Sequence, residues 1–556
     1  MINFNKITLS FIVLFTLTMS CKKEADLKNP NALQLEQLNT ETDLISIAQG
    51  GTYINGFNGP GGSSLGWLGD SYFSLGLAYH SLMGDEVGAE AANQLINQIS
   101  LPDKVTYDDG TSTNNSAPSR NVYRINNNIF NVGNNPLYYE WLSMYALNNS
   151  SNKTLSIINT IKINGDSTNK KNTLRAWAYW WKGFAYAKIG SMYYAGLIVN
   201  SVDAILPSTN KYVSSAKIIA ESNKNLDLAT ALINGITDET TYSDMLAALI
   251  PDFCEVGKGG VLTPTMWKHN INSLKARNLL VNKNLSGIGT MPTMTPADWT
   301  AVLALTNDGI GSGDYVFTGR TADANGFFSS GSGSIQAMTA INSGTSGHKT
   351  FRLSERLYQD FKATDLRRAN NFVSKIYKNQ VGGFTFSTRK SLKNGGAGNG
   401  SAVIANNAIG QQEIFIACSY EENELMKAEA NINLAGANLN TGLLSIDAVR
   451  SYQGSGLPLL AGTTITQAQA KEELRLERRT ALAFRGLAFY DARRIGYIYD
   501  VSKGGGRTGC VVYTSAGVVN TNAILNYNFF DYWDVPDNEL YINKASSDSD
   551  PVKNPN

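Results

Sequence analysis

The stretch that decides the fold is Glu424-Leu-Met-Lys-Ala-Glu-Ala-Asn-Ile-Asn-Leu-Ala-Gly436. Its apolar residues recur every three or four positions, the spacing that places side chains on one face of an α-helix. The residues of that face, which we expect to be buried, are Leu425, Ala428, Ile432 and Ala435. Gly436 suits the C-terminal cap of this helix. A second helix is predicted at once after it, over 440–452, with the apolar residues Leu444, Ala448 and Val449.

The same periodicity extends outward from this helix pair. A helix over 171–192 carries an apolar stripe that we expect in the core, together with Trp180: Leu174, Trp177, Trp181 and Phe184. Small residues such as Gly183 on the same helix allow a neighbouring helix to approach closely. Further helices are predicted at 40–57, 68–84, 138–161, 214–234, 264–284, 296–308, 352–363 and 466–498. Several of the helix pairs look like degenerate tetratricopeptide units, which stack to bury a continuous core.

Two stretches do not fit a helix. Residues 309–348 and 380–411 are rich in Gly, Ser and Asn, and the first contains scattered aromatic residues. Long loops inside a compact protein are uncommon and are usually functional or disordered. We expect them on one surface of the helical body, where ligand contacts would lie. The expected fold class is therefore mainly α, a tetratricopeptide-like scaffold with a loop-rich ligand-binding region and little β-structure.

Composition excludes several classes of protein. The 556 residues carry 47 Lys and Arg against 46 Asp and Glu, a net charge of +1 that excludes a chain-wide basic footprint for nucleic acid. The apolar content of 42% excludes intrinsic disorder. Four cysteines cannot form a disulfide scaffold in a chain of this length, and Cys254, Cys418 and Cys510 are expected to be isolated core thiols. Neutrality also favours an uncharged carbohydrate ligand over a polyanionic one.

The N-terminus has the pattern of a secretory signal. Lys6 precedes the apolar run Ile7–Met19, which is too short to span a bilayer but has the length of a signal-peptide core. The sequence Leu17-Thr18-Met19-Ser20-Cys21 resembles a bacterial lipobox, in which Cys21 is acylated and becomes the mature N-terminus. The alternative is an ordinary signal peptide with a chance cysteine. If Cys21 is acylated, the lipid is the expected membrane anchor.

Catalytic and metal-binding motifs are scarce. The three histidines, His80, His269 and His348, are isolated and exclude HExxH and zinc-finger spacings. Gly62-Ser-Ser-Leu-Gly66 matches G-x-S-x-G, but no strand is predicted before it, as a nucleophile elbow requires. Asp108-Asp109-Gly110 offers oxygen ligands without EF-hand spacing, and a solvated turn is the favoured interpretation. The adjacent carboxylates Asp85-Glu86 and Glu421-Glu422 do not define a glycosidase site, because only their spatial separation would. We expect no metal and no cofactor.

The C-terminal third carries a recognisable set of short stretches: Glu424–Gly436, Ile446–Arg450, Glu477-Arg478-Arg479, Leu482, Gly486, Phe489-Tyr490-Asp491, Arg493-Arg494, Trp533–Glu539, Asn543 and Asn554-Pro555. Together they resemble the SusD/RagB family of outer-membrane lipoproteins. Earlier segments agree: the helix from Leu174, the Trp141–Asn152 stretch and Asp365-Leu-Arg367. The chain departs from the family pattern at Asn431, Ala481 and Arg485. The charges of Glu477, Arg478, Asp491 and Arg493 are expected to form ion pairs of packing and not a site.

The resemblance implies a SusD-like fold with defined boundaries. Residues 1–20 would be the lipoprotein signal peptide and 21–38 the lipidated N-terminus and tether. The body would span 39–556, with a helical scaffold at 39–308 and 412–500, loop-rich insertions at about 309–411 and a C-terminal tail at 501–556. The implied function is non-catalytic capture of an oligo- or polysaccharide at the cell surface. Delivery to a SusC-like TonB-dependent transporter of the outer membrane would follow, and the lipid would anchor the protein there.

Sugar rings present apolar C–H faces that pack on aromatic side chains, and hydroxyls that need directed hydrogen bonds. The candidate ligand-binding residues are Trp67, Tyr72, Trp299, Tyr315, Phe327 and Phe328. For Trp299 the alternative is a place in the helix core. Three other functions stay open: peptide capture by a RagB-like lipoprotein, a lipid-anchored glycan hydrolase, and a protein–protein scaffold without a small ligand.

Overall fold

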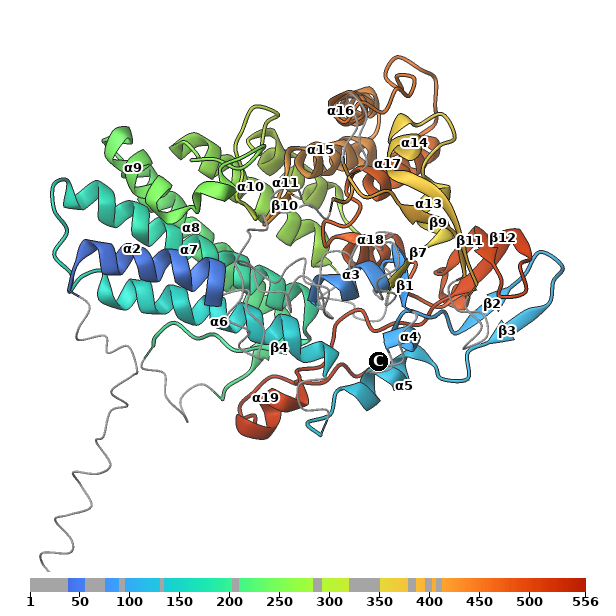
Figure 1. Ribbon diagram of the computed structural model, residues 1–556, viewed down its shortest axis with the longest axis horizontal. Helices are drawn as coiled ribbons and strands as arrows, with labels where there is room; N and C mark the ends of the chain where they lie inside the picture. Colours follow the sequence, from blue (N-terminus) through green and yellow to red (C-terminus); the bar gives the residue numbers. More distant parts are fainter. Residues whose placement is uncertain are drawn as a thin grey trace, which may run out of the picture.

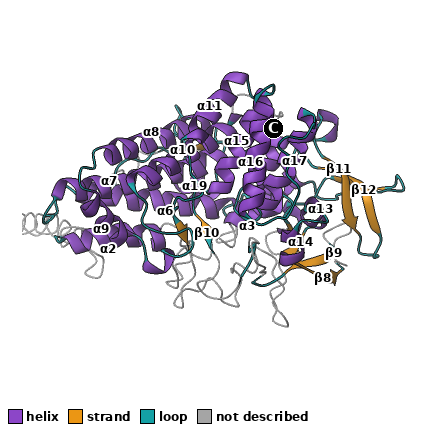
Figure 2. Ribbon diagram, turned by 90° about the horizontal axis from the view of Figure 1, so that it is seen from above, coloured by secondary structure: helices purple, strands orange, loops and turns teal. Residues whose placement is uncertain are grey.

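A computed structural model describes residues 39–55, 76–89, 96–130, 135–202, 210–283, 293–319, 351–378, 387–395, 403–406 and 413–556. Cys21 and four of the six candidate ligand residues, Trp67, Tyr72, Phe327 and Phe328, lie outside these ranges. The described chain is mainly helical with little strand, which confirms the expected fold class (Figures 1 and 2).

The first group of helices forms one side of the molecule in Figure 1. Its members are α2 (Glu41–Gly50), the π-helical turn η2 (Gly51–Asn55), α6 (Pro136–Ile157), α7 (Ser167–Met192), α8 (Ser215–Asn234), α9 (Glu239–Leu249), α10 (Pro264–Val281) and α11 (Pro296–Asn307). Helix α9 is absent from the sequence prediction. The close approach expected at Gly183 is confirmed, because a Cβ added there would lie 2.7 Å from the Leu226 side chain of α8. Ser222 of α8 also donates a hydrogen bond to the Gly183 carbonyl at 2.7 Å.

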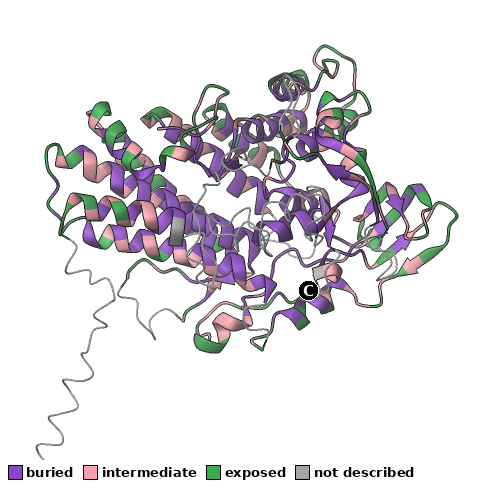
Figure 3. Ribbon diagram, viewed as in Figure 1, coloured by how far each residue is buried: buried purple, intermediate pink, exposed green. Residues whose placement is uncertain are grey.

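Aromatic side chains of α7 form the centre of the core. Trp177, Trp180 and Trp181 are at most 1% exposed, as predicted. Phe317 lies among them, with ring centroids 5.6, 4.5 and 6.1 Å from those of the three tryptophans. Trp267 of α10 contacts the same ring at 5.5 Å. Figure 3 shows the buried residues running through the interior of this helical stack, while the exposed ones lie on its outer faces.

The second group of helices comprises α15 (Tyr420–Leu434), α16 (Asn438–Tyr452), α17 (Gln467–Ala481) and α18 (Ala488–Ile495). The buried face of α15 is confirmed at Leu425, Ala428 and Ile432, each 0% exposed. Ala435 was expected on that face but is the C-cap, with a φ of 59°. A residue in this conformation has left the helix, so its side chain no longer follows the stripe.

Of the apolar residues singled out on α16, Val449 is buried but Leu444 is not. Leu444 is 54% exposed, whereas Leu443, Ile446 and Val449 are buried. Gly442 sets this orientation, because a Cβ there would lie 2.9 Å from the Ala428 carbonyl oxygen of α15. The face of α16 that carries Gly442 is therefore the one that can approach α15.

The single helix expected at 466–498 is broken into α17 and α18. The break contains Phe484, whose φ of 59° is incompatible with a continuing α-helix. The helix expected at 352–363 is also replaced by strand β7 (Phe351–Leu353) followed by the short helix α13 (Glu355–Asp360). Phe351 and Leu353 are buried and Arg352 between them is not, which is the alternation of a strand.

The remaining helices are short. They are α3 (Leu77–Met83), α4 (Ile96–Ile99), α5 (Ser119–Asn126), α14 (Leu366–Asn371), α19 (Asp537–Ile542) and the 3₁₀ turns η5 (Asp252–Cys254) and η8 (Val501–Lys503). One antiparallel sheet has the order β11-β12-β2-β3, formed by Arg507–Tyr513, Val519–Asn526, Lys104–Thr106 and Ser112–Asn114. The other strands of the described residues form four antiparallel pairs: β1 (Val87–Ala89) with β7, β4 (Ala195–Gly196) with β5 (Val213–Ser214), β6 (Thr318–Gly319) with β10 (Ile414–Phe415), and β8 (Phe372–Tyr377) with β9 (Thr388–Leu392).

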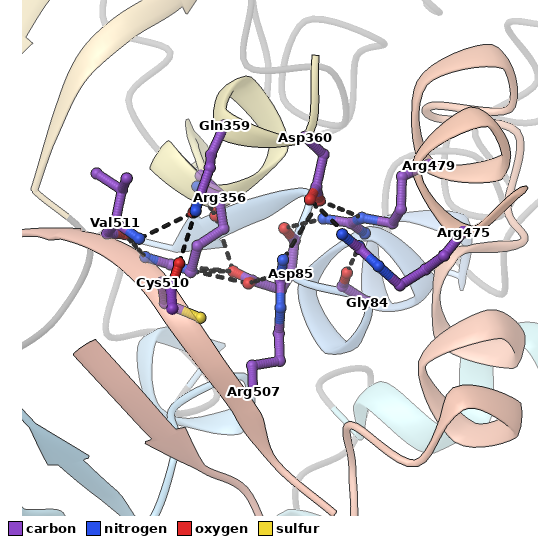
Figure 4. Close-up of polar contacts among 12 residues, drawn as sticks. Gly84, Asp85, Arg356, Gln359, Asp360, Arg475, Arg479, Arg507, Cys510 and Val511 are labelled. Carbon is purple, nitrogen blue, oxygen red and sulfur yellow. Dashed lines mark hydrogen bonds and ion pairs between the residues drawn. The ribbon is translucent and has the colours of Figure 1, made fainter. Parts of the chain in front are cut away.

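Buried ion pairs tie these elements together. Asp85, which follows α3, accepts hydrogen bonds from Arg356 of α13 at 2.7 Å and from Arg507 of β11 at 2.6 Å (Figure 4). Asp360 of α13 pairs with Arg479 of α17 at 3.1 Å. Burial alone would raise the pKa of the Asp85 carboxyl, but the arginines hold it well below its ordinary value. This network of buried ion pairs thus joins the helical stack to the sheet.

Three of the four charges singled out in the sequence, those of Glu477, Arg478 and Asp491, form structural ion pairs, as expected. The expectation was wrong for Arg493, which has no ion-pair partner among the described residues. Arg478 holds Asp491 through two hydrogen bonds of 3.0 and 2.9 Å, and Glu477 accepts from Arg367 at 2.6 Å. Arg493 donates to backbone carbonyls, among them that of Val281 at 3.0 Å. The three described cysteines, Cys254, Cys418 and Cys510, are free and buried, which confirms the prediction of isolated core thiols.

Candidate functional site

Two of the predicted ligand residues, Trp299 and Tyr315, can be placed. Trp299 lies on α11, is partly buried, and packs on a small second core of which Leu280 and Val302 are members. The two interpretations of Trp299 from the sequence, as a core residue and as a site residue, are both compatible with this position, because Trp299 also lines an open pocket of about 380 Å³. Tyr315 is 44% exposed, as a ligand-binding aromatic must be.

The structure does not bring these two aromatics together. Trp299 shares its pocket with Leu280, near the C-terminal end of α10. The Tyr315 ring instead packs on Gly260, just before the N-terminal end of α10 at Pro264. A helix rises 1.5 Å per residue, so roughly 25 Å of helix separates the two positions. They therefore belong to two different surfaces.

Tyr315 is held by its backbone neighbours. Val316 donates a hydrogen bond to the Lys258 carbonyl at 2.9 Å, and the Lys258 ammonium donates to the Ser312 carbonyl. Asp314 accepts from the Gly311 amide at 2.8 Å and lies 2.8 Å from Nδ1 of His269 on α10. These contacts fix the turn before β6, so that the tyrosine is presented by a rigid segment.

Two further tyrosines lie beside this turn. The Lys258 Nζ is 5.5 Å from the centroid of the Tyr452 ring, which is 39% exposed. Tyr452 packs edge-on against Tyr420, with centroids 4.9 Å apart. The Glu413 carboxylate accepts hydrogen bonds from the amides of Lys258 at 2.7 Å and Gly259 at 3.2 Å. We call this group, comprising Tyr315, Tyr420, Tyr452, Lys258 and Glu413, the tyrosine face.

The tyrosine face borders the β6–β10 pair. In Figure 2, β10 lies on the side of the molecule opposite α8 and α11. Partial burial together with nearby carboxylates raises the pKa of both Tyr420 and Tyr452 to about 12. Both phenols therefore keep their protons at neutral pH and can donate hydrogen bonds.

Arg485 supports this surface from below. Its guanidinium lies 4.2 Å from the centroid of the Phe415 ring and donates to Ser419 Oγ at 2.7 Å and to Glu421 at 3.0 Å. Burial would raise the pKa of Glu421, but the pairing with Arg485 outweighs it and lowers that pKa to about 2. The departure from the family pattern at Arg485 thus has a partner that stabilises its charge.

Sequence reasoning missed Tyr420 and Tyr452. Both stand at helix ends, since Tyr420 begins α15 and Tyr452 ends α16. Gly454 and Gly456 follow Tyr452 closely. An aromatic residue at a helix end beside a Gly-rich loop is a signal for exposure, and it was available in the sequence.

The pocket at Trp299 is lined by both apolar and charged side chains. Arg494 pairs there with Glu429 at 2.7 Å, and Arg475 with Glu472 at 2.7 Å. The charges on its wall are thus largely committed to one another. Met294 and Leu474 add apolar surface.

Titratable groups elsewhere serve the interior. His80 contacts Glu140 at 3.0 Å, and Lys188 pairs with the same carboxylate at 3.0 Å, all three being buried. Burial and the cation of Lys188 lower the pKa of His80. Within the described ranges, no group of three or more His, Cys, Asp or Glu side chains is arranged to hold a metal ion.

The adjacent carboxylates do not form a cleft. Asp85, Glu421 and Glu422 are buried, and each pairs with an arginine. The turn at Asp108 is closed by its own hydrogen bonds, because that carboxylate accepts from the amides of Thr521 and Asn522 at 2.8 and 2.9 Å. Both observations assign these groups to structure. His348 and the Gly62–Gly66 motif lie outside the described residues.

Among the helices that can be described, none combines the length and apolar character that crossing a membrane requires.

No protein-family model matches the chain, and no curated protein matches it either. Solved structures do. A SusD-like carbohydrate-binding protein from Bacteroides vulgatus ATCC 8482 is similar with a TM-score of 0.52 and 14% sequence identity, over 93% of this chain and 99% of that one. A SusD-like carbohydrate-binding protein from Bacteroides fragilis NCTC 9343 gives 0.51 and 15%, over 84% and 97%. A crystal structure with xylogluco-oligosaccharide gives 0.56 and 13%, over 92% and 99%.

These similarities extend over nearly the whole length of both chains. The protein therefore has a SusD-like fold, which confirms the fold that the sequence resemblance implied.

Proposed function

We propose that the protein is a non-catalytic glycan-binding lipoprotein of the SusD/RagB type. It captures an oligo- or polysaccharide at the cell surface and passes it to a SusC-like TonB-dependent transporter of the outer membrane. The observation that carries this proposal is the tyrosine face, an exposed and rigid group of aromatic rings with hydrogen-bonding neighbours on a SusD-like fold.

The chemistry of the face suits a sugar. The rings of Tyr315 and Tyr452 offer apolar area for the C–H faces of a pyranose, and their phenols offer hydrogen bonds to its hydroxyls. Lys258 and Glu413 lie within the same surface and supply a donor and an acceptor of opposite charge. Similar proteins described as carbohydrate-binding, and a similar structure solved with xylogluco-oligosaccharide, support the same ligand class.

The test is binding of the purified protein to a panel of neutral polysaccharides and of oligopeptides, with the products of any cleavage measured in parallel. Saturable glycan binding without cleavage is expected. The double variant Tyr315→Ala/Tyr452→Ala should lose about 1–3 kcal/mol of binding free energy, since each aromatic contact contributes about 0.5–1.5 kcal/mol. Tyr541→Ala is the matched control, because Tyr541 is 75% exposed on α19, away from the face.

Unchanged affinity in the double variant would remove the tyrosine face from the site. Binding of peptides alone would favour the RagB-like alternative, and turnover of a glycan would show an enzyme.

The anchor and the partner need separate tests. Cys21→Ala should release the protein from membranes, because acyl insertion is the proposed attachment. A variant that stays in the membrane fraction would contradict lipidation at Cys21. Co-purification of the wild-type protein with a TonB-dependent transporter from outer membranes would support the delivery role, and its absence under mild detergent would weaken that role.

A further inference from the structure

Charge is distributed unevenly along this neutral chain. Residues 351–395 contain ten lysines and arginines but only three acidic residues, a net charge of +7, while the whole chain carries +1. The rest of the protein is therefore net negative by 6 charges. This segment forms β7, α13, α14, β8 and β9.

The three acidic side chains of the segment do not neutralise the positive charge on its outer surface. Glu355, Asp360 and Asp365 are at most 4% exposed, and each pairs with an arginine. The buried carboxylates thus neutralise arginines that are themselves mainly interior. The cations left on the outside are not among those partners.

Among the described residues of this segment, four surface cations have no carboxylate partner. Within the described part of the chain, no ion pair is formed by Arg368, Lys378, Lys390 or Lys393. Lys378 and Lys393 are exposed, and Arg368 and Lys390 are partly so. A surface cation without a carboxylate partner can attract an anionic ligand, over a distance set by the ionic strength.

Tyrosine rings lie beside two of these cations, Arg368 and Lys390, and beside Arg352. The Tyr358 ring has the Arg368 guanidinium 4.1 Å and the Lys390 ammonium 4.5 Å from its centroid. The Arg352 guanidinium lies 3.9 Å from the Tyr377 ring. Burial would raise the pKa of Tyr358, but the two cations beside it lower that pKa. Three cations are therefore in direct contact with two tyrosine rings.

The group is mounted on a firm base. Lys390 donates to Ser374 Oγ across the β8–β9 ladder at 3.1 Å. Arg389, next along β9, holds Glu355 of α13 at 2.7 Å. We call Arg352, Arg368, Lys378, Lys390 and Lys393, with Tyr358 and Tyr377, the basic face. Figure 2 places β8 and β9 on the same side of the molecule as β10, which borders the tyrosine face.

We propose that the basic face binds an acidic polysaccharide, one that carries carboxylate or sulfate groups along its chain. The inference rests on the proposed glycan-binding function and names its ligand class. Spaced cations attract a repeated negative charge, and the tyrosine rings between them offer the apolar area that a sugar ring requires. The net charge of the whole chain conceals this, because acidic residues elsewhere cancel the excess.

A glycan is favoured over an anionic membrane by the form of the surface. The cations lie beside tyrosine rings in an aromatic arrangement, and not on the polar side of an amphipathic helix with an apolar face to insert. The candidate ligand is therefore a polysaccharide of charged sugar units that lies across the β8–β9 pair.

The experiment measures binding of the purified protein to polygalacturonate and chondroitin sulfate, with neutral xyloglucan in parallel. Binding to an acidic glycan is expected to weaken as salt rises from about 50 mM to about 500 mM. The variant Lys378→Gln/Lys390→Gln should weaken it by about 5- to 30-fold, since each exposed charge contact is worth up to about 1 kcal/mol. Lys162→Gln/Lys544→Gln removes the same charge from exposed residues elsewhere and should change the affinity less than about twofold.

Several outcomes would overturn the inference: no binding to either acidic glycan, an equal loss in the two lysine variants, or binding only to vesicles that contain phosphatidylglycerol. The two proposals fail separately. Loss of neutral-glycan binding in Tyr315→Ala/Tyr452→Ala tests the tyrosine face, whereas the lysine variant should leave xyloglucan binding unchanged. Acidic-glycan binding that depends on the tyrosine variant but not on the lysine variant would also refute the basic face.

Discussion

Replacing Asp85 by asparagine removes one buried negative charge and keeps the shape of the side chain. Asp85 is 5% exposed and accepts hydrogen bonds from Arg356, Arg507 and Ser354 Oγ, the last at 2.8 Å. Its φ of 58° lies in the left-handed region, which asparagine adopts readily, so the substitution adds no backbone strain. The variant therefore isolates the effect of the charge (Figure 4).

The expected cost follows from the arginines left behind. Breaking a buried pair from one side destabilises a protein by about 3–5 kcal/mol, because the remaining charge is uncompensated. A chain of this size unfolds with an entropy of roughly 1.1 kcal/mol/K. The melting temperature should therefore fall by about 3–5 °C.

Differential scanning calorimetry of the two proteins measures this shift. Asp227→Asn is the control, since Asp227 pairs with Lys275 but is 62% exposed, and a surface pair is worth about 1 kcal/mol or less. The folded-state pKa of Asp85 is lowered, so its contribution is present above its ordinary value near 3.8 and is lost as the pH falls further. Equal melting temperatures for Asp85→Asn and the wild type at pH 7 would refute a stabilising role for the buried ion pairs of Asp85.

Phe317→Ala should destabilise the protein by about 3–5 kcal/mol, because it leaves a cavity at the centre of the tryptophan core. Urea denaturation monitored by tryptophan fluorescence would measure this loss. A loss of stability below about 1 kcal/mol would contradict that packing. Gly442→Val should lower the free energy of unfolding by about 1–3 kcal/mol, because the added side chain would overpack against the Ala428 carbonyl. The urea midpoint should fall accordingly, and an unchanged midpoint would mean that α15 and α16 do not meet there. Glu421 has a folded pKa of about 2, so it stabilises the fold above its ordinary pKa of 4.5 and this contribution is lost as the pH falls from 4.5 toward 2. Comparing Glu421→Gln with wild type across that range should show their stability difference narrowing, and a constant difference would exclude pairing with Arg485.

Much of the fold followed from local patterns. The buried stripe of α7 and most of that of α15 were predicted correctly, because helical periodicity relates residues only three or four positions apart. Which leucine of α16 is buried did not follow from the sequence, since Leu443 and Leu444 are equally apolar and only the contact of Gly442 with α15 distinguishes them. The break at Phe484 was missed although Gly486 follows it closely, because a single glycine is tolerated inside a helical pattern and does not by itself end a helix.

The candidate site was harder to predict. Tyr315 was chosen for its Gly-rich surroundings and is exposed, while Trp299 lies on a different surface. Tyr452 joins Tyr315 only because Lys258 lies between the segments that carry them. Those segments are far apart in the chain, so no local spacing could have grouped them.

The sequence by itself determined the helical scaffold, the apolar faces of most long helices, and the resemblance that pointed to a SusD-like fold. It also contained the excess of positive charge at 351–395, which counting alone reveals. Only the tertiary structure decided which of those charges face solvent. Asp85 and Arg507 are 422 residues apart and still neutralise each other, whereas Lys390 has a tyrosine ring beside it and no carboxylate partner in the described part of the chain. Periodicity is a property of neighbours in the chain, but pairing of charges is a property of neighbours in space.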